Sequence, residues 1–252
     1  MSGHSKWSTI KHQKASTDAR RGQLFTKLSK GIAQAVRQGG GPNEDMNFKL
    51  RLAVQKAKDS NMPSDNIERA IKKAAGGEGQ DQLEDTIYEG YGPGGVAILA
   101  ECLTSNRNRT SSEVRAVFNK LGGNLGEAGC VSWNFQAKGL ISLDTDPDNV
   151  EDIALLAIDG GADDVKVEGG YIEIYTSSQN LESVRDRVES SGIKVSSSEE
   201  SKVPSSVVSI EGKQSYQTLK LLDSLEELDD VQKVYSNADF PDEVLESYSN
   251  QS

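Results

Sequence analysis

The hydrophobic pattern of the chain changes its period near residue 77, and this change limits the possible folds most. Up to Ala75 the apolar residues recur every three or four positions, which predicts α-helices. The polar stretch GGEGQDQ at 76–82 separates these helices from alternating apolar segments that are typical of strands. The 252 residues therefore predict an α+β protein of several domains, with a small helical domain followed by two α/β domains.

Charge is divided between the same two parts of the chain. Residues 1–75 hold 15 Lys and Arg against 6 Asp and Glu, a net charge of +9. Residues 76–252 hold 13 against 33, a net charge of −20, and the whole chain carries −11. A basic head on an acidic body indicates that the head binds a polyanion while the body has another role.

Three helices are predicted in the head, after a basic arm at residues 3–19. The first helix has one apolar and one cationic face at 100° per residue, and the GGGP segment at 39–42 ends it. The second runs from about Asn43, a good N-cap, to about Ser60, with Met46 on its packing face. The third begins after Ser64 as N-cap and ends at Gly76. Together they form a nucleic-acid-binding domain at 1–77.

The cationic side chains of the head are the candidate nucleic-acid contacts. The cationic face of the first helix lacks interspersed acids and continues into the lysines of the arm, which favours phosphate binding over an ordinary solvated face. Trp7 is the one aromatic residue of the arm and is expected to be available to stack on a base. The candidates in the head are Lys6, Trp7, Lys11, Lys14, Arg20, Arg21, Lys27 and Lys30.

Two arginines form a second candidate site in the acidic body. The segment NRNRT places Arg107 and Arg109 in a loop just before TSSE at 110–113, a capping box that opens a helix. Backbone N–H groups at a helix N-terminus favour an anion, so the pair is a candidate phosphate contact. The alternative is two arginines that face only solvent.

The body is predicted to contain one domain inserted in another. Residues 139–203 follow the order β-α-β-β-α-β of the ferredoxin-like unit, with IKVSS at 193–197 as the last strand. They interrupt an α/β domain formed by residues 78–138 and 204–240, and residues 241–252 are predicted to be a polar tail. The ferredoxin-like unit has a net charge of −10 and lacks the aromatic RNA-binding pattern, so a protein contact is expected there instead.

Neither a cofactor nor a metal is expected. Cys102, Cys130, His4 and His12 have no zinc-motif spacing, and the match to G-x-G-x-x-G at 90–95 is followed by a strand rather than a helix. No nucleophile–base pair is recognisable, which argues against an enzyme. No apolar run approaches the roughly 18 residues of a membrane helix.

Several motifs resemble those of the YebC/PmpR family. These are GHSKW near the N-terminus, NMPSDNIERAIKK at 61–73, YEGYGPGGVA at 88–97, NRNRT at 106–110 and DDVQKVYSN at 229–237. The resemblance extends from Ser2 to about Asn237. It implies a three-domain, DNA-binding transcriptional regulator, although mitochondrial relatives activate translation and bacterial members are linked to ribosomes. Since the motifs begin at residue 2 and the basic character continues through Lys73, a cytoplasmic protein without a transit peptide is expected.

The nature of the polyanion stays open between DNA and structured or ribosomal RNA. A sequence-specific DNA reader usually presents Arg, Asn or Gln at the start of a recognition helix, whereas this head presents mostly Lys. Lysine suits the positioning of phosphates better than the reading of bases. Weak discrimination between DNA sequences is therefore expected, and a translation factor bound to RNA is the alternative to a transcriptional regulator. A pure protein-interaction adaptor would leave the +9 head without a purpose.

Overall fold

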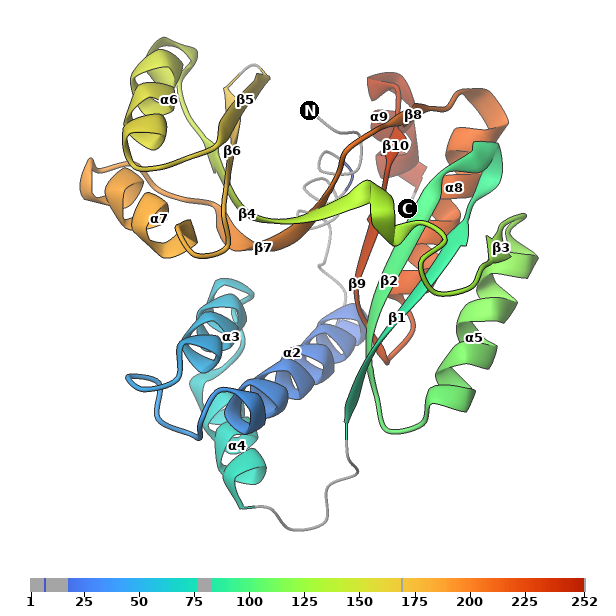
Figure 1. Ribbon diagram of the computed structural model, residues 1–252, viewed down its shortest axis with the longest axis horizontal. Helices are drawn as coiled ribbons and strands as arrows, with labels where there is room; N and C mark the ends of the chain where they lie inside the picture. Colours follow the sequence, from blue (N-terminus) through green and yellow to red (C-terminus); the bar gives the residue numbers. More distant parts are fainter. Residues whose placement is uncertain (1–6, 8–17, 77–82, 169, 252) are drawn as a thin grey trace.

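A helical domain and two α/β units make up the described part of the chain (Figure 1). The structure is a computed structural model that describes residue 7 and residues 18–76, 83–168 and 170–251. We call residues 18–76 the helical domain. The first α/β unit comprises residues 83–134 and 205–251, and the second α/β unit comprises residues 135–168 and 170–204.

Three amphipathic helices form the helical domain by closing around one apolar cluster. Leu28, Ile32 and Val36 recur every four residues and are buried in this cluster. The first helix ends before Gly40 and Gly41, whose positive φ angles of 96° and 116° suit glycine. The predicted order of helices followed by sheets is confirmed. The helices are α2 (Asp18–Gln38), α3 (Phe48–Asp59) and α4 (Ser64–Ala75).

The second of these helices begins later than predicted. Asn47, and not Asn43, is the N-cap of α3, because its side-chain oxygen accepts a hydrogen bond from the Leu50 amide at 2.9 Å. Met46 therefore precedes the helix and is 83% exposed instead of packed. Either asparagine is a good cap by residue type, so the sequence pattern alone could not decide between them.

An antiparallel sheet in the order β3-β1-β2-β9 is the centre of the first α/β unit. Its β1–β2 hairpin turns at Gly94, which has a φ of 75°. Alternate side chains of β2, among them Ile98 and Ala100, pack with α5 and α8 in the largest apolar cluster. The elements are β1 (Glu84–Tyr91), η1 (Pro93–Gly95), β2 (Ala97–Thr104), α5 (Arg107–Lys120), β3 (Asn124–Leu125), η2 (Ser132–Asn134), β8 (Val208–Ser209), α8 (Gly212–Glu226), β9 (Val231–Ser236), β10 (Ala238–Asp239) and α9 (Asp242–Gln251).

The second α/β unit interrupts the first between β3 and β9. Its four strands are antiparallel in the order β5-β6-β4-β7, and α6 and α7 pack on the sheet through Ile153, Ala157 and Val184. The observed element order is β-α-β-β-α-β, as the sequence predicts. The elements are β4 (Phe135–Asp144), η3 (Pro147–Asn149), α6 (Val150–Asp159), β5 (Asp164–Glu168), β6 (Tyr171–Thr176), α7 (Leu181–Ser190) and β7 (Ser197–Pro204).

Two predicted segments differ from the structure. The last strand of the second unit is not IKVSS but β7, an edge strand without apolar alternation that pairs with β4 along its whole length. The predicted polar tail is the helix α9, because Leu245 is buried against the first α/β unit and the Tyr248 hydroxyl donates to Asp223 Oδ2 at 2.7 Å. A single buried leucine among polar residues is too weak a pattern to predict a helix.

Candidate nucleic-acid interface

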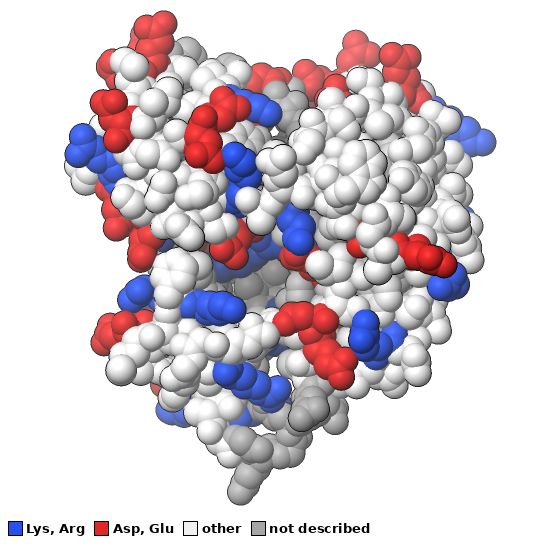
Figure 2. All heavy atoms as spheres, in the orientation of Figure 1, with Lys and Arg blue, Asp and Glu red and all other residues white. Residues whose placement is uncertain are grey.

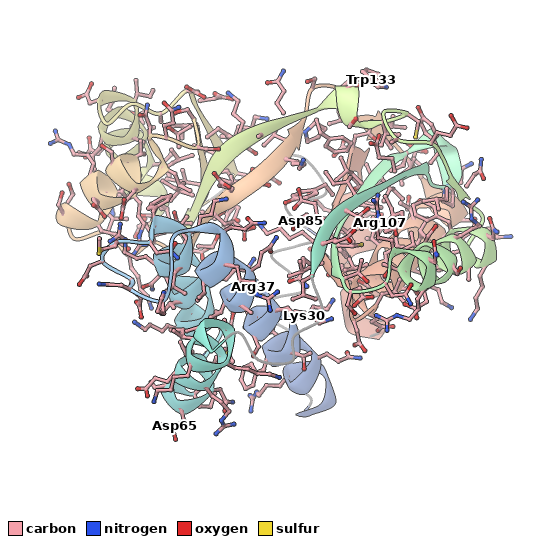
Figure 3. The ribbon with its side chains drawn as sticks, turned by 60° about the horizontal axis from the view of Figure 1, so that its bottom comes forward. Lys30, Arg37, Asp65, Asp85, Arg107 and Trp133 are labelled. Carbon is pink, nitrogen blue, oxygen red and sulfur yellow. The ribbon has the colours of Figure 1, made fainter. Side chains whose placement is uncertain are left out.

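One polar side of α2 is turned toward the first α/β unit. Lys27, Lys30, Gln34 and Gln38 are three or four residues apart, so they lie along one side of the helix. We call these four residues the donor stripe, because each presents side-chain N–H groups. Figure 3 shows Lys30 on α2 and Asp85, at the start of β1, on the facing unit.

Every member of the donor stripe binds an acceptor of the first α/β unit. The Lys27 ammonium donates to the carbonyl oxygen of Glu226, at the end of α8. Both side-chain amides of the stripe donate to the Asp85 carboxylate, Gln34 to Oδ1 and Gln38 to Oδ2. The side of α2 that the sequence predicts to meet phosphate is thus a contact between domains.

The Lys30 ammonium reaches the most buried acceptor of this contact, Asp230. Lys30 Nζ lies 3.0 Å from Asp230 Oδ1 and 3.0 Å from the Asp229 carbonyl oxygen. Asp230 Oδ2 also accepts hydrogen bonds from Arg109 Nη2 at 2.6 Å and from the hydroxyls of Thr104 and Thr110 at 3.0 and 2.8 Å. One carboxylate therefore joins α2, the end of β2, α5 and the start of β9.

The surroundings of Asp230 keep it charged. Its side chain is 4% exposed, and burial alone would raise its pKa. The hydrogen bonds from Arg109, Thr110 and Lys30 outweigh burial and hold the pKa of Asp230 well below its usual range. A buried carboxylate with this many donors has a structural role, and the cations around it are bound to it in ion pairs.

Arg107 and Arg109 do not act as a pair. Helix α5 begins at Arg107 with Asn106 as its N-cap, so both arginines lie in the first helical turn and not in a preceding loop. Arg109 is bound to Asp230, whereas the exposed Arg107 guanidinium lies 3.5 Å from the hydroxyl of Thr86. Of the two predicted anion contacts, Arg107 alone keeps a guanidinium without a carboxylate partner among the described residues.

A second carboxylate, Glu199 on β7, joins all three parts of the protein. Its Oε2 lies 3.0 Å from the ammonium of Lys56 on α3 and 3.0 Å from that of Lys233 on β9. Burial would raise the pKa of Glu199, but the charges of Lys233 and Lys56 overcome it and lower the pKa. Burial also lowers the pKa of Lys233, although Glu199 opposes this. Arg51 adds a longer ion pair to Glu182 of α7, at 3.7 Å.

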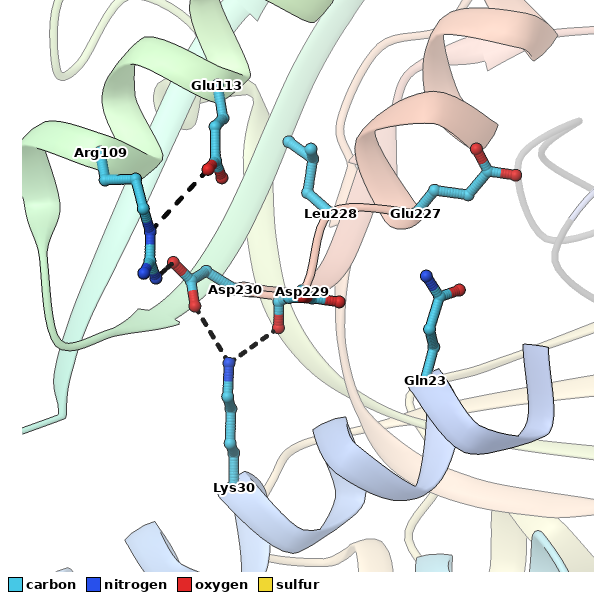
Figure 4. A pocket seen from close by; sticks show the side chains of 8 residues that line it. All are labelled: Gln23, Lys30, Arg109, Glu113, Glu227, Leu228, Asp229 and Asp230. Atoms are coloured by element: carbon cyan, nitrogen blue, oxygen red, sulfur yellow. Dashed lines mark hydrogen bonds and ion pairs between the residues drawn. The ribbon is translucent and has the colours of Figure 1, made fainter. Parts of the chain in front are cut away.

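A cavity of about 510 Å³ opens between α2, α5 and the loop before β9 (Figure 4). Its two cations, Lys30 and Arg109, already bind Asp230. Four carboxylates surround them, so the cavity would repel a phosphate and is not a candidate site for one. The lining residues are Gln23, Lys30, Arg109, Glu113, Glu227, Leu228, Asp229 and Asp230.

The arm does not present its aromatic residue to solvent. Trp7 is 3% exposed and packs in the apolar cluster of the first α/β unit, together with Ile210 and Phe240. The prediction that Trp7 is available for stacking is therefore wrong for this arrangement, because the indole is part of a core. Three other candidates, Lys6, Lys11 and Lys14, and the side chain of Arg20 lie outside the described residues.

Basic side chains remain exposed on the helical domain away from the donor stripe. Figure 2 shows Lys and Arg on the helical domain and around the hollow between it and the α/β units, where Asp and Glu side chains of the α/β units also lie. Arg21 is one of the predicted candidates in this set. Besides Arg51 and Lys56, which pair with the second α/β unit, the exposed residues are Arg21, Arg37, Lys49, Lys58, Arg69, Lys72 and Lys73.

Sequence reasoning missed the acceptors of this interface. Asp85, Glu199 and Asp230 lie far along the chain from the helices that they bind, and none belongs to a local motif for ion pairing. One available indication was the segregation of charge itself. A cationic helix face without acids, in a chain whose remainder is strongly acidic, fits pairing within the protein as well as pairing with phosphate.

The described residues contain neither a cluster of metal ligands nor a membrane-spanning helix. No group of three or more His, Cys, Asp and Glu side chains there is arranged to hold a metal ion. No helix in the same part of the chain is long and apolar enough to cross a bilayer.

Comparisons with known proteins cover nearly the whole chain. Residues 5–77 match the family model described as the TACO1/YebC protein N-terminal domain, and residues 83–238 match the model described as the TACO1/YebC second and third domain. The crystal structure of a conserved hypothetical protein, Aq1575 from Aquifex aeolicus, is 46% identical with a TM-score of 0.83. That similarity covers 92% of this chain and 96% of the other.

Full-length relatives carry a common name. A "Probable transcriptional regulatory protein" of Dehalococcoides mccartyi is 54% identical over 251 residues, and one of Herpetosiphon aurantiacus is 50% identical over 255 residues. Each of these alignments covers 100% of both chains. Two family models that together span most of the chain, and this identity over its full length, show that the chain belongs to the TACO1/YebC family.

Proposed function

We propose that this protein is a non-enzymatic regulator of gene expression that binds nucleic acid through its helical domain. The observation that carries the proposal is the concentration of basic charge in residues 1–75, which have a net charge of +9 in a chain of −11. Exposed cations of α2, α3 and α4 remain after the donor stripe has bound its acceptors. Such a surface attracts a phosphate backbone without reading its sequence.

The relatives' name favours DNA as the partner and a role in transcription. The chemistry of the helical domain supports structured RNA, and hence translation, as a second candidate. The glutamines and lysines of the donor stripe are bound to protein acceptors, so α2 does not present them for base reading in this arrangement. We therefore expect the protein to discriminate between duplex sequences by less than about 100-fold, below the 10³-fold or more of a specific regulator.

Competition binding with the full-length protein distinguishes these candidates. A labelled duplex is displaced by a promoter sequence, by a scrambled duplex and by ribosomal RNA, at several salt concentrations. The proposal expects ribosomal RNA to compete at least as well as either duplex, and log K to fall by about 0.9 per phosphate contact with log salt on duplex DNA. A preference above 10³-fold for one duplex, with ribosomal RNA a poor competitor, would leave a conventional transcription factor.

A triple variant assigns the affinity to the helical domain. Arg69→Ala, Lys72→Ala and Lys73→Ala remove three exposed cations of α4 and are expected to weaken binding and reduce the salt slope. The matched control removes three exposed lysines of the acidic units, by Lys194→Ala, Lys213→Ala and Lys220→Ala. Equal losses of affinity in the two variants would refute a role specific to the helical domain.

A further inference from the structure

We infer that the protein's own carboxylates and carbonyls occupy cations that a nucleic-acid backbone contacts, so that full binding requires the helical domain to separate from the α/β units. This inference rests on the proposed function and adds a means of regulating it. The shared cations are Lys27, Lys30 and Lys56, and we call them the latch lysines. Their protein partners are Glu226, Asp229, Asp230 and Glu199.

The acceptors of the latch lysines resemble phosphate oxygens in charge and reach. Lys30 Nζ lies 3.0 Å from one carboxylate oxygen and 3.0 Å from one carbonyl oxygen, and Lys56 Nζ lies 3.0 Å from a carboxylate oxygen. An ammonium makes the same kind of charge-assisted contact with a phosphate oxygen. The ammonium of a latch lysine can donate to either partner. It cannot keep its full contact with the protein acceptor while it binds a phosphate oxygen.

Polar side-chain contacts join the helical domain to the α/β units, and no apolar cluster of the described residues is shared between them. The helical core contains only residues of α2, α3, α4 and their loops, and the cores of the two α/β units contain none of them. The latch side chains are partly exposed, 23% for Lys30 and 44% for Lys56. The pair of Lys56 and Glu199, with side chains 44% and 35% exposed, is expected to change an equilibrium constant by only about one- to fivefold, which keeps this part of the contact reversible.

Each acidic partner retains another donor when the helical domain leaves. Asp230 keeps Arg109, Thr104 and Thr110, all within the first α/β unit. Glu199 keeps Lys233. Separation therefore leaves no buried carboxylate without a donor, whereas it frees every latch lysine. Separation thus exposes the latch lysines to a phosphate backbone, whereas the carboxylates stay paired within the α/β units.

The inference predicts opposite effects from the two sides of the contact. Removing acceptors, by Asp85→Ala with Glu199→Ala, breaks the contacts of Gln34, Gln38 and Lys56, weakens the attachment of the helical domain and keeps all its cations. It is expected to tighten binding roughly three- to tenfold. Removing donors, by Lys27→Ala, Lys30→Ala and Lys56→Ala, also weakens the attachment of the domain. It is expected to weaken binding at least tenfold and to reduce the salt slope. If the contact had only a structural role, the acceptor variant and the donor variant would change the affinity for nucleic acid in the same direction.

A matched control separates this effect from the general loss of negative charge. Asp163→Ala with Glu189→Ala also removes two carboxylates, but their ion pairs with Lys138 and Arg185 lie within the second α/β unit. The control is expected to change affinity by less than twofold, because its side chains do not touch the helical domain. Binding is measured with a duplex DNA oligonucleotide and with an RNA hairpin, so that the two sources of phosphate are compared directly.

Energy transfer between two dyes reports the separation itself in the full chain. The dyes are attached through Asp65→Cys, on the helical domain (Figure 3), and Lys220→Cys, on α8, in a Cys130→Ser background. Cys102 is buried, and burial raises the pKa of its thiol to about 12, so it does not compete for the label. Transfer is expected to fall in both latch variants, and in the wild type when the RNA hairpin or the duplex is added.

The outcomes distinguish the inference from the proposed function. Tighter binding of the acceptor variant, together with reduced energy transfer, supports the inference that protein acceptors compete with nucleic acid for the latch lysines. Unchanged or weaker binding of the acceptor variant overturns this inference and leaves the proposed function in place. Unchanged energy transfer when nucleic acid saturates the wild type does the same. If neither the wild type nor any variant binds DNA or RNA, the proposed function fails, and the latch inference fails with it.

Discussion

Asp230 joins two helices and two strands, α2, α5, β2 and β9, through one buried carboxylate, and its charge is central to the arrangement of the units. Its donors come from α2, α5 and the end of β2. They lower the pKa of Asp230, so the folded state favours the ionised form. The contribution of the ionised Asp230 to the stability of the folded state is therefore complete above the ordinary pKa of aspartate, about 3.9. It is lost as the pH falls below that value toward the pKa in the folded state.

We predict that Asp230→Asn lowers the free energy of unfolding by about 3 kcal/mol at neutral pH, because Lys30 and Arg109 lose their shared anion. The loss should shrink as the pH falls below 4, since the wild type then loses the same charge. Urea denaturation of both proteins between neutral and acidic pH measures this. Stability curves that run parallel at all pH values would contradict the assignment.

Trp7 is a core residue by its burial, in contrast with the stacking role predicted from sequence. Of the two tryptophans, Trp7 is 3% exposed and Trp133 is 72% exposed. We predict that Trp7 in a Trp133→Phe variant emits at short wavelength and keeps its emission when nucleic acid is added. We also predict that Trp7→Ala lowers the free energy of unfolding by about 3–5 kcal/mol. Quenching of Trp7 at saturating RNA, with little loss of stability in the alanine variant, would restore the stacking role.

At the scale of elements, the sequence predicts the helices and the β1–β2 hairpin well and the ends of elements poorly. The four-residue repeat of Leu28, Ile32 and Val36 and the glycine turn at Gly94 have local causes, and both are observed. The start of α3, strand β7 and helix α9 depend on partners elsewhere in the chain. Leu245 of α9, for example, is buried because the rest of the first α/β unit lies against it.

Helix α5 separates two arginines that the sequence treats as equivalent. Arg109 binds the buried Asp230, whereas the Arg107 guanidinium stays exposed. We predict that Arg109→Ala lowers the melting temperature, and that Arg107→Ala changes it by less than about 2 °C because exposed charges contribute little. Differential scanning calorimetry of the two single variants measures this. Equal melting temperatures for both would show that the contact between Arg109 and Asp230 does not stabilise the fold.

In the whole molecule, the charge asymmetry allows the basic head both to bind a polyanion and to pair with the acidic body, and the sequence alone could not separate these two roles. Lys30 and Asp230 are 200 positions apart, and Lys27 and Glu226 are 199 apart. No local pattern predicts which distant acid a lysine will meet, so the composition predicted a polyanion-binding head but not its contact with the acidic body. The same lysines that make the head basic also hold it in place.

The most direct test of the whole account is to locate the bound nucleic acid on the intact protein. The full-length chain is photocrosslinked to duplex DNA and to structured RNA at low salt, and the crosslinked peptides are identified by mass spectrometry. We predict crosslinks within residues 1–76, where the basic charge is concentrated, and few in residues 135–204. Crosslinks confined to the acidic α/β units, with none in the helical domain, would contradict it.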